Sequence, residues 1–290
     1  MDHYERKIEL FFELKGTPDS SQESYRRRIL AFLGYMNKCN RPISEMNEHD
    51  IQQYILHLKK ENGLAASTIN NYISSIKFFY TYILEKDWNS RKVPRMKRIQ
   101  TFPMVPSRDE VFSLLDTTKN LKHKAILVLM YGSGLRVSEV ARLKISDICS
   151  KSMRVRIENA KHNTNRYTIL SKFALEILRD YFRLYFTPGE YCSSDWLFPG
   201  QSKQNHIHVK TIKNTIIKLR DSVGLDSKIS AHTLRHCFAT HALEDGVEPV
   251  FIQQMLGHKR LQTTLTYLHI TSKSLMGVQS PLDRQGGPMG

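Results

Sequence analysis

Apolar residues return at helical spacing along most of this 290-residue chain, and a strand-like alternation occurs in only one region. The side chains of an amphipathic helix meet its core every three or four residues, whereas those of a half-buried strand do so at every second residue. The alternation spans residues 153–157, gives way to the turn-forming letters ENAKHNTN, and resumes at residues 167–170. The chain is therefore expected to be mainly α-helical, with one small antiparallel β-sheet.

Residues 1–90 predict a helical domain. Ser20 and Glu23 fit a capping box ahead of a helix whose apolar residues recur through residues 25–36. The same spacing predicts helices near residues 51–58 and 69–83, and residues 5–14 can add a fourth. Helices of this kind bury one shared core and leave charged residues outside. Three lysines are expected to face outward as candidate DNA contacts: Lys59, Lys60 and Lys77.

A basic segment follows the helical domain. The letters RKVPRMKR carry five basic residues, no acidic one, and a proline that interrupts any helix. We place a linker at residues 91–106, either a solvated connector or a strap across DNA phosphates. The strap would use five side chains: Arg91, Lys92, Arg95, Lys97 and Arg98.

The net charge favours a polyanionic partner. Forty-three Lys and Arg oppose twenty-eight Asp and Glu, which leaves +15, and such a surplus favours nucleic acid through counterion release, although a solvated charged surface is the plainer explanation. The longest apolar run is seven residues, too short to cross a bilayer, and the N-terminus lacks an apolar signal core. The four cysteines form no CxxC pair. We expect a cytoplasmic protein, in bacteria one of the cytosol or nucleoid, with reduced thiols and no membrane contact.

Residues 107–290 predict a second, mixed domain. Ser107 and Glu110 form a capping box, and the apolar run 125–131 is typical of a central core helix that ends at the Gly132-Ser133-Gly134 triplet. After the expected hairpin, helical spacing returns at residues 173–185 and 212–219 and continues from Thr233.

Several polar residues of this second domain could carry chemistry together. Two arginines can clamp a phosphodiester, a tyrosine can attack it covalently, and histidine and lysine can move the protons. The candidates are Arg136, Lys161, His232, Arg235, His258 and Tyr267. Taken singly, each also has an ordinary structural explanation. A metal at His232, His236 and His241 is not expected, because neither an HExxH motif nor a set of carboxylate ligands accompanies them.

Four segments resemble the catalytic boxes of tyrosine recombinases, the phage-integrase family. They are GLRVSEVARL at 134–143, HTLRHCFATHALEDGV at 232–247, IQQMLGH at 252–258 and TTLTYLH at 263–269. The resemblance assigns Arg136 and Arg235 to the family's two arginines and Tyr267 to its nucleophile. His232 matches the histidine of the H-x-x-R motif, and His258 matches that of the L-G-H box. The helical first domain is similar to the family's core-binding domain.

The resemblance implies an activity and partners. A family member cleaves and rejoins double-stranded DNA through a 3′-phosphotyrosyl intermediate without metal, ATP or another cofactor, as a homotetramer on two DNA sites with paired core sequences. The expected role is the integrase or transposase of a mobile element. A resolvase of chromosome or plasmid dimers shares this chemistry, a type IB topoisomerase is a weaker alternative, and a DNA-binding protein without catalysis is a rival of another class.

The chain departs from the family pattern in two places. Lys161 keeps the position of the hairpin lysine that the resemblance makes the general acid, but Ala160 and His162 replace its usual glycine neighbours, and His162 is a possible substitute donor. After Tyr267 the family commonly has a helix that docks on a neighbouring protomer, but the final letters SPLDRQGGPMG are poor in helix formers and apolar residues, so docking would fall to residues 270–278 or be made differently.

Overall fold

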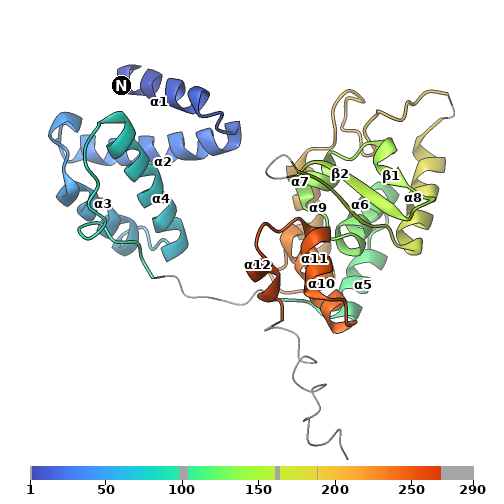
Figure 1. Ribbon diagram of the computed structural model, residues 1–290. Coiled ribbons are helices and arrows are strands. Elements are labelled where there is room, and N and C mark those ends of the chain that lie inside the picture. Colours follow the sequence, from blue (N-terminus) through green and yellow to red (C-terminus); the bar gives the residue numbers. More distant parts are fainter. Residues whose placement is uncertain (1, 98–103, 161–163, 188, 269–290) are drawn as a thin grey trace, which may run out of the picture. The chain divides into compact units, whose positions relative to one another are not determined.

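The fold is described from a computed structural model that covers residues 2–97, 104–160, 164–187 and 189–268 (Figure 1). The chain divides into two compact units, Met1–Thr101 and Phe102–Gly290. Each unit buries its own hydrophobic core, so each is described by itself.

The first unit is entirely helical over the residues that the structure describes. Its elements are α1 (Asp2–Leu14), α2 (Asp19–Lys38), the 3-10 turn η1 (Ile43–Glu45), α3 (Glu48–Lys60), α4 (Ala66–Phe78) and the π-helical turn η2 (Phe79–Ile83). Phe32, Ile51 and Phe79 are completely buried at its centre. The rings of Phe12 and Phe78 stack with centroids 5.0 Å apart, which joins α1 to α4. This is the helical domain that the apolar spacing predicted.

The start of α2 corrects one sequence prediction. Ser20 and Glu23 do not cap a helix, because α2 already begins at Asp19 and its N-cap residue is Pro18. A proline fits immediately before a helix for two reasons. Its fixed φ, here −58°, is compatible with the start of a helix, and a residue at this position donates no intrahelical hydrogen bond, so the missing N–H costs none. The reciprocal capping box of this unit belongs instead to α3, between Asn47 and Asp50.

The first residues of the basic segment pack against the helices of the first unit. Val93 is 2% exposed within the helical core. The Asn70 side chain both accepts from the backbone N–H of Met96 and donates to its carbonyl, each at 2.9 Å. Arg95 donates to Ser74 Oγ on α4 at 2.8 Å. These contacts hold Arg95 and Met96 against α4, and Arg98 lies outside the described residues.

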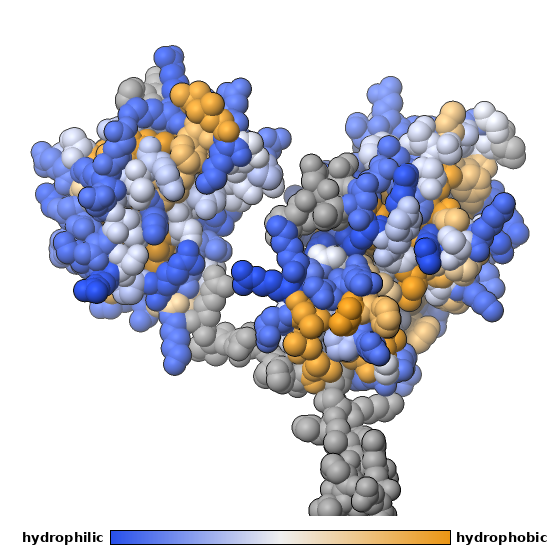
Figure 2. Space-filling view, in the orientation of Figure 1, coloured by the Kyte–Doolittle hydropathy of each residue, from blue (hydrophilic) through white to orange (hydrophobic). Residues whose placement is uncertain are grey.

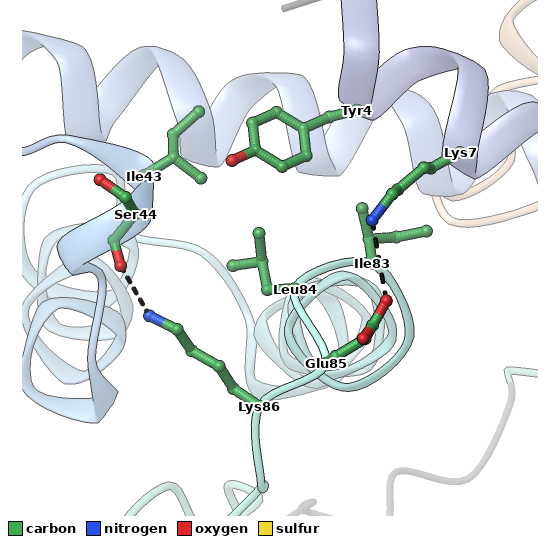
Figure 3. A pocket seen from close by; sticks show the side chains of 8 residues that line it. All are labelled: Tyr4, Lys7, Ile43, Ser44, Ile83, Leu84, Glu85 and Lys86. Carbon is green, nitrogen blue, oxygen red and sulfur yellow. Dashed lines mark hydrogen bonds and ion pairs between the residues drawn. The ribbon is translucent and has the colours of Figure 1, made fainter.

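A hollow of about 300 Å³ lies where α1, η1 and the end of η2 meet (Figure 3). Lys86 Nζ donates to the carbonyls of Ser44 and Met46 at 3.0 and 2.7 Å. Lys7 pairs with Glu85 at 3.7 Å on the opposite rim. Both cations therefore bind groups of the unit itself, and we assign this hollow a structural role in joining its helices.

The second unit packs helices against a small sheet that buries Val155 and Ile157 on one face and exposes Tyr167 and Ile169 on the other. Its elements are α5 (Arg108–Asp116), α6 (Leu121–Gly132), α7 (Val137–Ala141), η3 (Ile145–Asp147), β1 (Ile148–Cys149), β2 (Arg154–Ala160), β3 (Thr164–Ile169), α8 (Lys172–Tyr185), α9 (Val209–Ser222), α10 (Ala231–Glu244), α11 (Pro249–Leu256) and α12 (Leu261–Leu265). The sheet is antiparallel in the order β1-β2-β3, with Val155 opposite Thr168. Residues 125–130 of α6 are all buried, so the mainly α fold with a small antiparallel sheet and a central core helix is confirmed.

The hairpin between β2 and β3 is tighter than its letters suggest. Glu158 and Asn165 belong to the letters expected to form the turn, yet both lie in strands. The register of the β2–β3 pair shifts between Ile157 and Ala160, and Ala160 then pairs with Thr164, so the strands continue beyond this irregularity. The expected turn, including Lys161 and His162, lies outside the described residues.

Within the described part of the chain, no helix is long and apolar enough to cross a membrane.

Candidate active site

The link from α6 to α7 sets the first arginine. Gly134 has a φ of +64°, a conformation that favours glycine, and a Cβ there would lie 2.5 Å from the ring of Phe238. The close turn leaves Arg136 as the N-cap residue of α7, where its backbone N–H donates to Glu139 Oε2 at 2.8 Å. The side chain of Arg136 is 21% exposed, so it lies at the surface of the site.

Helix α10 supplies the second arginine from a buried position. His232 and Arg235 lie three residues apart on its first turns, as the spacing predicted. Arg235 is only 3% exposed, and its guanidinium donates to the carbonyls of Gly134 at 2.8 Å and Leu256 at 2.5 Å. Burial and the nearby charge of Arg136 lower the pKa of Arg235 to about 9. The group still carries its charge at neutral pH and is fixed by main-chain acceptors.

Glu139 joins the arginines, and sequence reasoning did not select it. Its carboxylate accepts from Arg136 at 2.7 Å and lies 3.7 Å from the Arg235 guanidinium. Arg166 of β3 binds both carboxylate oxygens, at 2.9 and 2.8 Å, in the two-pronged geometry that suits guanidinium. Burial raises the pKa of Glu139, but the hydrogen bonds and charges of Arg166 and Arg136 outweigh burial and lower the pKa to about 2.

Arg166 was also missed, and its surroundings explain its role. Its side chain is 8% exposed, and its Nε donates to the carbonyl of Met255 at 2.8 Å. Gly257, two residues after Met255, has a φ of +63°, and a Cβ at Gly257 would lie 2.9 Å from the Arg166 side chain. The sequence signal for Glu139 was its position three residues after Arg136. For Arg166 the only signal was a charged residue in a strand.

The end of α11 and the short α12 place the last two predicted residues. His258 follows the left-handed cap at Gly257, and its Nδ1 lies 2.9 Å from Thr264 Oγ1 of α12. Tyr267 is in the turn just after α12 and is 5% exposed. Its ring lies 6.3 Å from that of His258, nearly parallel at 19°.

The tyrosine oxygen has a histidine partner that sequence reasoning did not assign. Tyr267 Oη lies 2.8 Å from Nδ1 of His236, the residue after Arg235 on α10. Burial raises the pKa of Tyr267, and the charges of Arg235 and Arg136 offset this in part. The phenol is therefore protonated at neutral pH.

The three histidines of the site are neutral at pH 7. Burial, followed by the charges of neighbouring histidines and arginines, lowers the pKa of His236 and of His258 to about 4 in each case. The pKa of His232 is also lowered, mainly by burial and the charge of Arg235. A compact group of fixed arginines, neutral imidazoles and one phenol suits the binding of a singly charged phosphodiester and its attack by a tyrosine oxygen.

The structure brings five of the six predicted residues together, with Arg136, His232, His258 and Tyr267 all near the buried Arg235. Lys161 lies outside the described residues. The spacing considered for a metal separates into different contacts, because His236 contacts Tyr267 whereas His241 contacts Tyr131 Oη at 2.9 Å. Over the described ranges, no three His, Cys, Asp or Glu side chains are grouped so as to hold a metal ion.

The lysines proposed for DNA contact are all exposed. Lys59 and Lys60 end α3, and Lys77 lies near the end of α4 with its Nζ 6.0 Å from the ring of Trp88. In the basic segment, Lys92 reaches Glu48 at 3.5 Å while Lys97 is exposed. Contact of these groups with DNA stays a prediction.

Comparison with known proteins decides the family. Residues 107–274 match the model of the phage integrase family, and residues 5–90 match that of the phage integrase N-terminal SAM-like domain. The chain belongs to the phage integrase family. It is a tyrosine recombinase, an enzyme that cleaves and rejoins DNA.

Individual relatives of this recombinase span nearly its whole length. A Sinorhizobium fredii protein named "Putative integrase/recombinase y4qK" is 37% identical over 91% of this chain and 83% of its own. The tyrosine recombinase XerD of Oceanobacillus iheyensis is 30% identical over 93% of this chain and 96% of its own. The crystal structure of XerH bound to a palindromic difH substrate, a post-cleavage complex, shares the fold with a TM-score of 0.73 at 18% identity, over 94% of this chain and 82% of that one.

Proposed function

We propose that Tyr267 attacks the scissile phosphate of double-stranded DNA and forms a 3′-phosphotyrosyl bond. The observation that carries this proposal is the position of its phenol, buried beside Arg235, which main-chain carbonyls hold, and Arg136, which the Glu139 carboxylate holds. The P–O5′ bond breaks as the Oη–P bond forms. The new bond keeps the energy of the broken linkage, so a 5′-hydroxyl from a partner strand can reverse the reaction without ATP.

Arg136 and Arg235 bind the non-bridging oxygens in this proposal and stabilise the charge of the transition state. Arg136 is tied to Glu139 through Nη1, and its partial exposure leaves the rest of its guanidinium fork for a phosphate. His258 is braced by Thr264 through Nδ1, so its Nε2 can donate to the phosphate together with His232. Lys161 protonates the departing 5′-oxygen, with His162 as the alternative donor.

We further propose that the partner is duplex DNA with paired core sites, bound by four protomers on two sites. The net charge of +15 and the exposed Lys59, Lys60 and Lys77 support DNA contact. XerH is a structural relative solved in complex with a difH substrate.

Apolar side chains gather in patches on the visible surface (Figure 2). On α11, Val250 and Phe251 are 46% and 55% exposed, which suits contact between protomers.

For the biological role we propose the integrase or transposase of a mobile element, acting in the bacterial cytosol or nucleoid. The support is the higher identity to the S. fredii integrase/recombinase, 37%, than to the O. iheyensis XerD, 30%. Resolution of chromosome dimers is the second candidate. Amplification of joined element ends from cells expressing the gene tests the first role. Filamentous cells after gene deletion, without any joined ends, would favour the second.

The test of the chemistry is covalent capture on a nicked suicide substrate. Tyr267→Phe should bind DNA with unchanged affinity yet form no adduct on a denaturing gel, since only the attacking oxygen is removed. Tyr131→Phe is the matched control, because it also removes a phenol held by a histidine of α10 but outside the site. An adduct that persists in Tyr267→Phe would show that another residue is the nucleophile.

A further inference from the structure

The phenol of Tyr267 needs a proton acceptor when it attacks, and the site offers three histidines. His258 uses Nδ1 toward Thr264, and the ring of His232 lies beside that of His236, with centroids 6.0 Å apart. His236 Nδ1 is the ring nitrogen at hydrogen-bond distance from Tyr267 Oη, at 2.8 Å. A candidate base has to be within about 2.6–3.2 Å of the proton that it removes. Among the described histidines, His236 meets this requirement.

We propose that His236, one residue beyond the H-x-x-R motif, is a further catalytic residue that takes the phenolic proton of Tyr267 during DNA cleavage and returns it during rejoining. This inference rests on the proposed role of Tyr267 as nucleophile. It assigns the Tyr267 O–H as donor and Nδ1 as acceptor, which leaves the ring proton of the neutral histidine on Nε2.

The protonation states of the free protein support this assignment. Tyr267 keeps its proton, because burial raises its pKa, and His236 is neutral, because burial and the charges of His232 and Arg235 lower its pKa. A protonated phenol beside a neutral imidazole is the pair that general base catalysis requires. The charges facing this pair come from Arg235 on α10 and Arg136 before α7.

Bound DNA makes His236 a stronger base. The scissile phosphodiester adds one negative charge next to Arg136 and Arg235, and this charge offsets the positive field that disfavours an imidazolium. The pKa of His236 therefore rises when substrate occupies the site. The free protein holds the base neutral, and the substrate itself increases its basicity at the step that needs it.

The proton and bond changes balance in both directions. During cleavage the Tyr267 Oη–P bond forms, the P–O5′ bond breaks, and the phenolic proton moves to Nδ1 of His236. The 5′-oxygen leaves with a proton from the proposed general acid, Lys161. During rejoining the 5′-hydroxyl gives its proton back to that group, and the imidazolium of His236 reprotonates the departing tyrosine oxygen.

Two substitutions separate proton transfer from mere positioning. His236→Ala removes the ring, whereas His236→Asn leaves an amide that can still bind the phenol near the place of Nδ1 but cannot take its proton. Loss of a general base slows a step by about 10²–10⁴-fold. Both variants should form the covalent adduct slower by that factor on the suicide substrate.

A second change bypasses the base. Replacing Tyr267 with a ring-fluorinated tyrosine lowers the phenol pKa, and an assay at a pH above the lowered value starts from an attacking oxygen that is already ionised and needs no acceptor. With this nucleophile, His236→Ala and His236→Asn should differ from the protein with native His236 by less than about tenfold. His241→Ala is the control, since it removes the other histidine–tyrosine contact of α10 and should cleave like wild type with either nucleophile.

Each outcome has a distinct meaning. Equal slowing of His236→Ala with both nucleophiles, or normal cleavage by His236→Asn with native tyrosine, would overturn proton transfer in favour of a positioning role. Normal cleavage by His236→Ala with native tyrosine would remove His236 from the reaction. Melting temperatures of the variants separate these results from misfolding. Absence of any adduct with the wild-type protein would instead refute the proposed role of Tyr267.

Discussion

Replacing Glu139 with glutamine should destabilise the second unit, because it removes a buried charge that three arginines share. The Glu139 side chain is 8% exposed, and Arg166 binds both of its oxygens from an equally buried position. The glutamine amide keeps the shape of the carboxylate, but its NH₂ group replaces one of the two oxygens and so faces an arginine N–H, donor against donor. An arginine left without its counter-charge inside a protein typically costs about 3–5 kcal/mol.

The pKa of the carboxylate gives an independent magnitude. The pKa of Glu139 falls from an ordinary 4.5 to about 2, since the hydrogen bonds and charges of Arg166 and Arg136 outweigh the opposing effect of burial. At about 1.4 kcal/mol for each pH unit, this difference is worth about 3 kcal/mol. Because the pKa is lowered in the folded state, the stabilisation is complete above pH 4.5 and disappears as the pH falls toward 2.

Urea unfolding followed by fluorescence measures this effect. Trp88→Phe in all proteins leaves Trp196 as the reporter of the second unit. Glu139→Gln should lower the free energy of unfolding by about 3 kcal/mol at pH 7 and by about 2 kcal/mol at pH 3.5. For a unit of this size, the change at pH 7 corresponds to a melting temperature lower by about 6–12 °C.

Glu158→Gln is the matched control for this measurement. Glu158 also pairs with an arginine, Arg156, at 3.1 Å, but its side chain is 36% exposed. Such a surface pair contributes about 0–1 kcal/mol. A loss in Glu139→Gln that is no larger than in Glu158→Gln, or that stays constant between pH 7 and pH 3.5, would refute the assignment of this stability to the charge of Glu139.

Three further predictions concern DNA cleavage and binding. Arg136→Lys and Arg235→Lys should each slow adduct formation by about 10²–10³-fold, because an ammonium cannot reproduce the planar fork; near-normal rates would make that arginine structural. Lys161→Ala should cleave normal DNA very slowly but cleave a substrate with sulfur at the 5′-bridging position nearly as fast as wild type, since a thiolate leaves without a proton; slow cleavage of both would end its role as acid. Five side chains of the basic segment can be neutralised: Arg91, Lys92, Arg95, Lys97 and Arg98. Their loss should reduce the slope of log affinity against log salt by about 0.9 for each DNA phosphate that the protein no longer binds. An unchanged slope would show that these side chains do not bind DNA.

Local patterns in the sequence were sufficient for the helices, the small sheet and most members of the site. An unbroken apolar run predicted α6 as the buried central helix, because a helix inside a core is covered on every side. Alternation predicted the β2–β3 hairpin, because successive side chains of a strand point to opposite faces. The order of the motifs selected Arg136, Arg235 and Tyr267, which the structure brings together. Local rules failed at the start of α2, where the N-cap residue is Pro18, two residues before the Ser20 that the capping box predicted.

Only tertiary structure decided what holds the site in place. Arg166 reaches Glu139 across 27 positions, and Arg235 reaches the carbonyl of Gly134 across 101, so neither contact leaves a periodic trace in the sequence. The same is true of the contact between His236 and Tyr267, 31 positions apart. Sequence patterns record which face of an element is buried, whereas the partner of a buried polar group depends on which elements meet, and buried charges must find such partners when the chain folds.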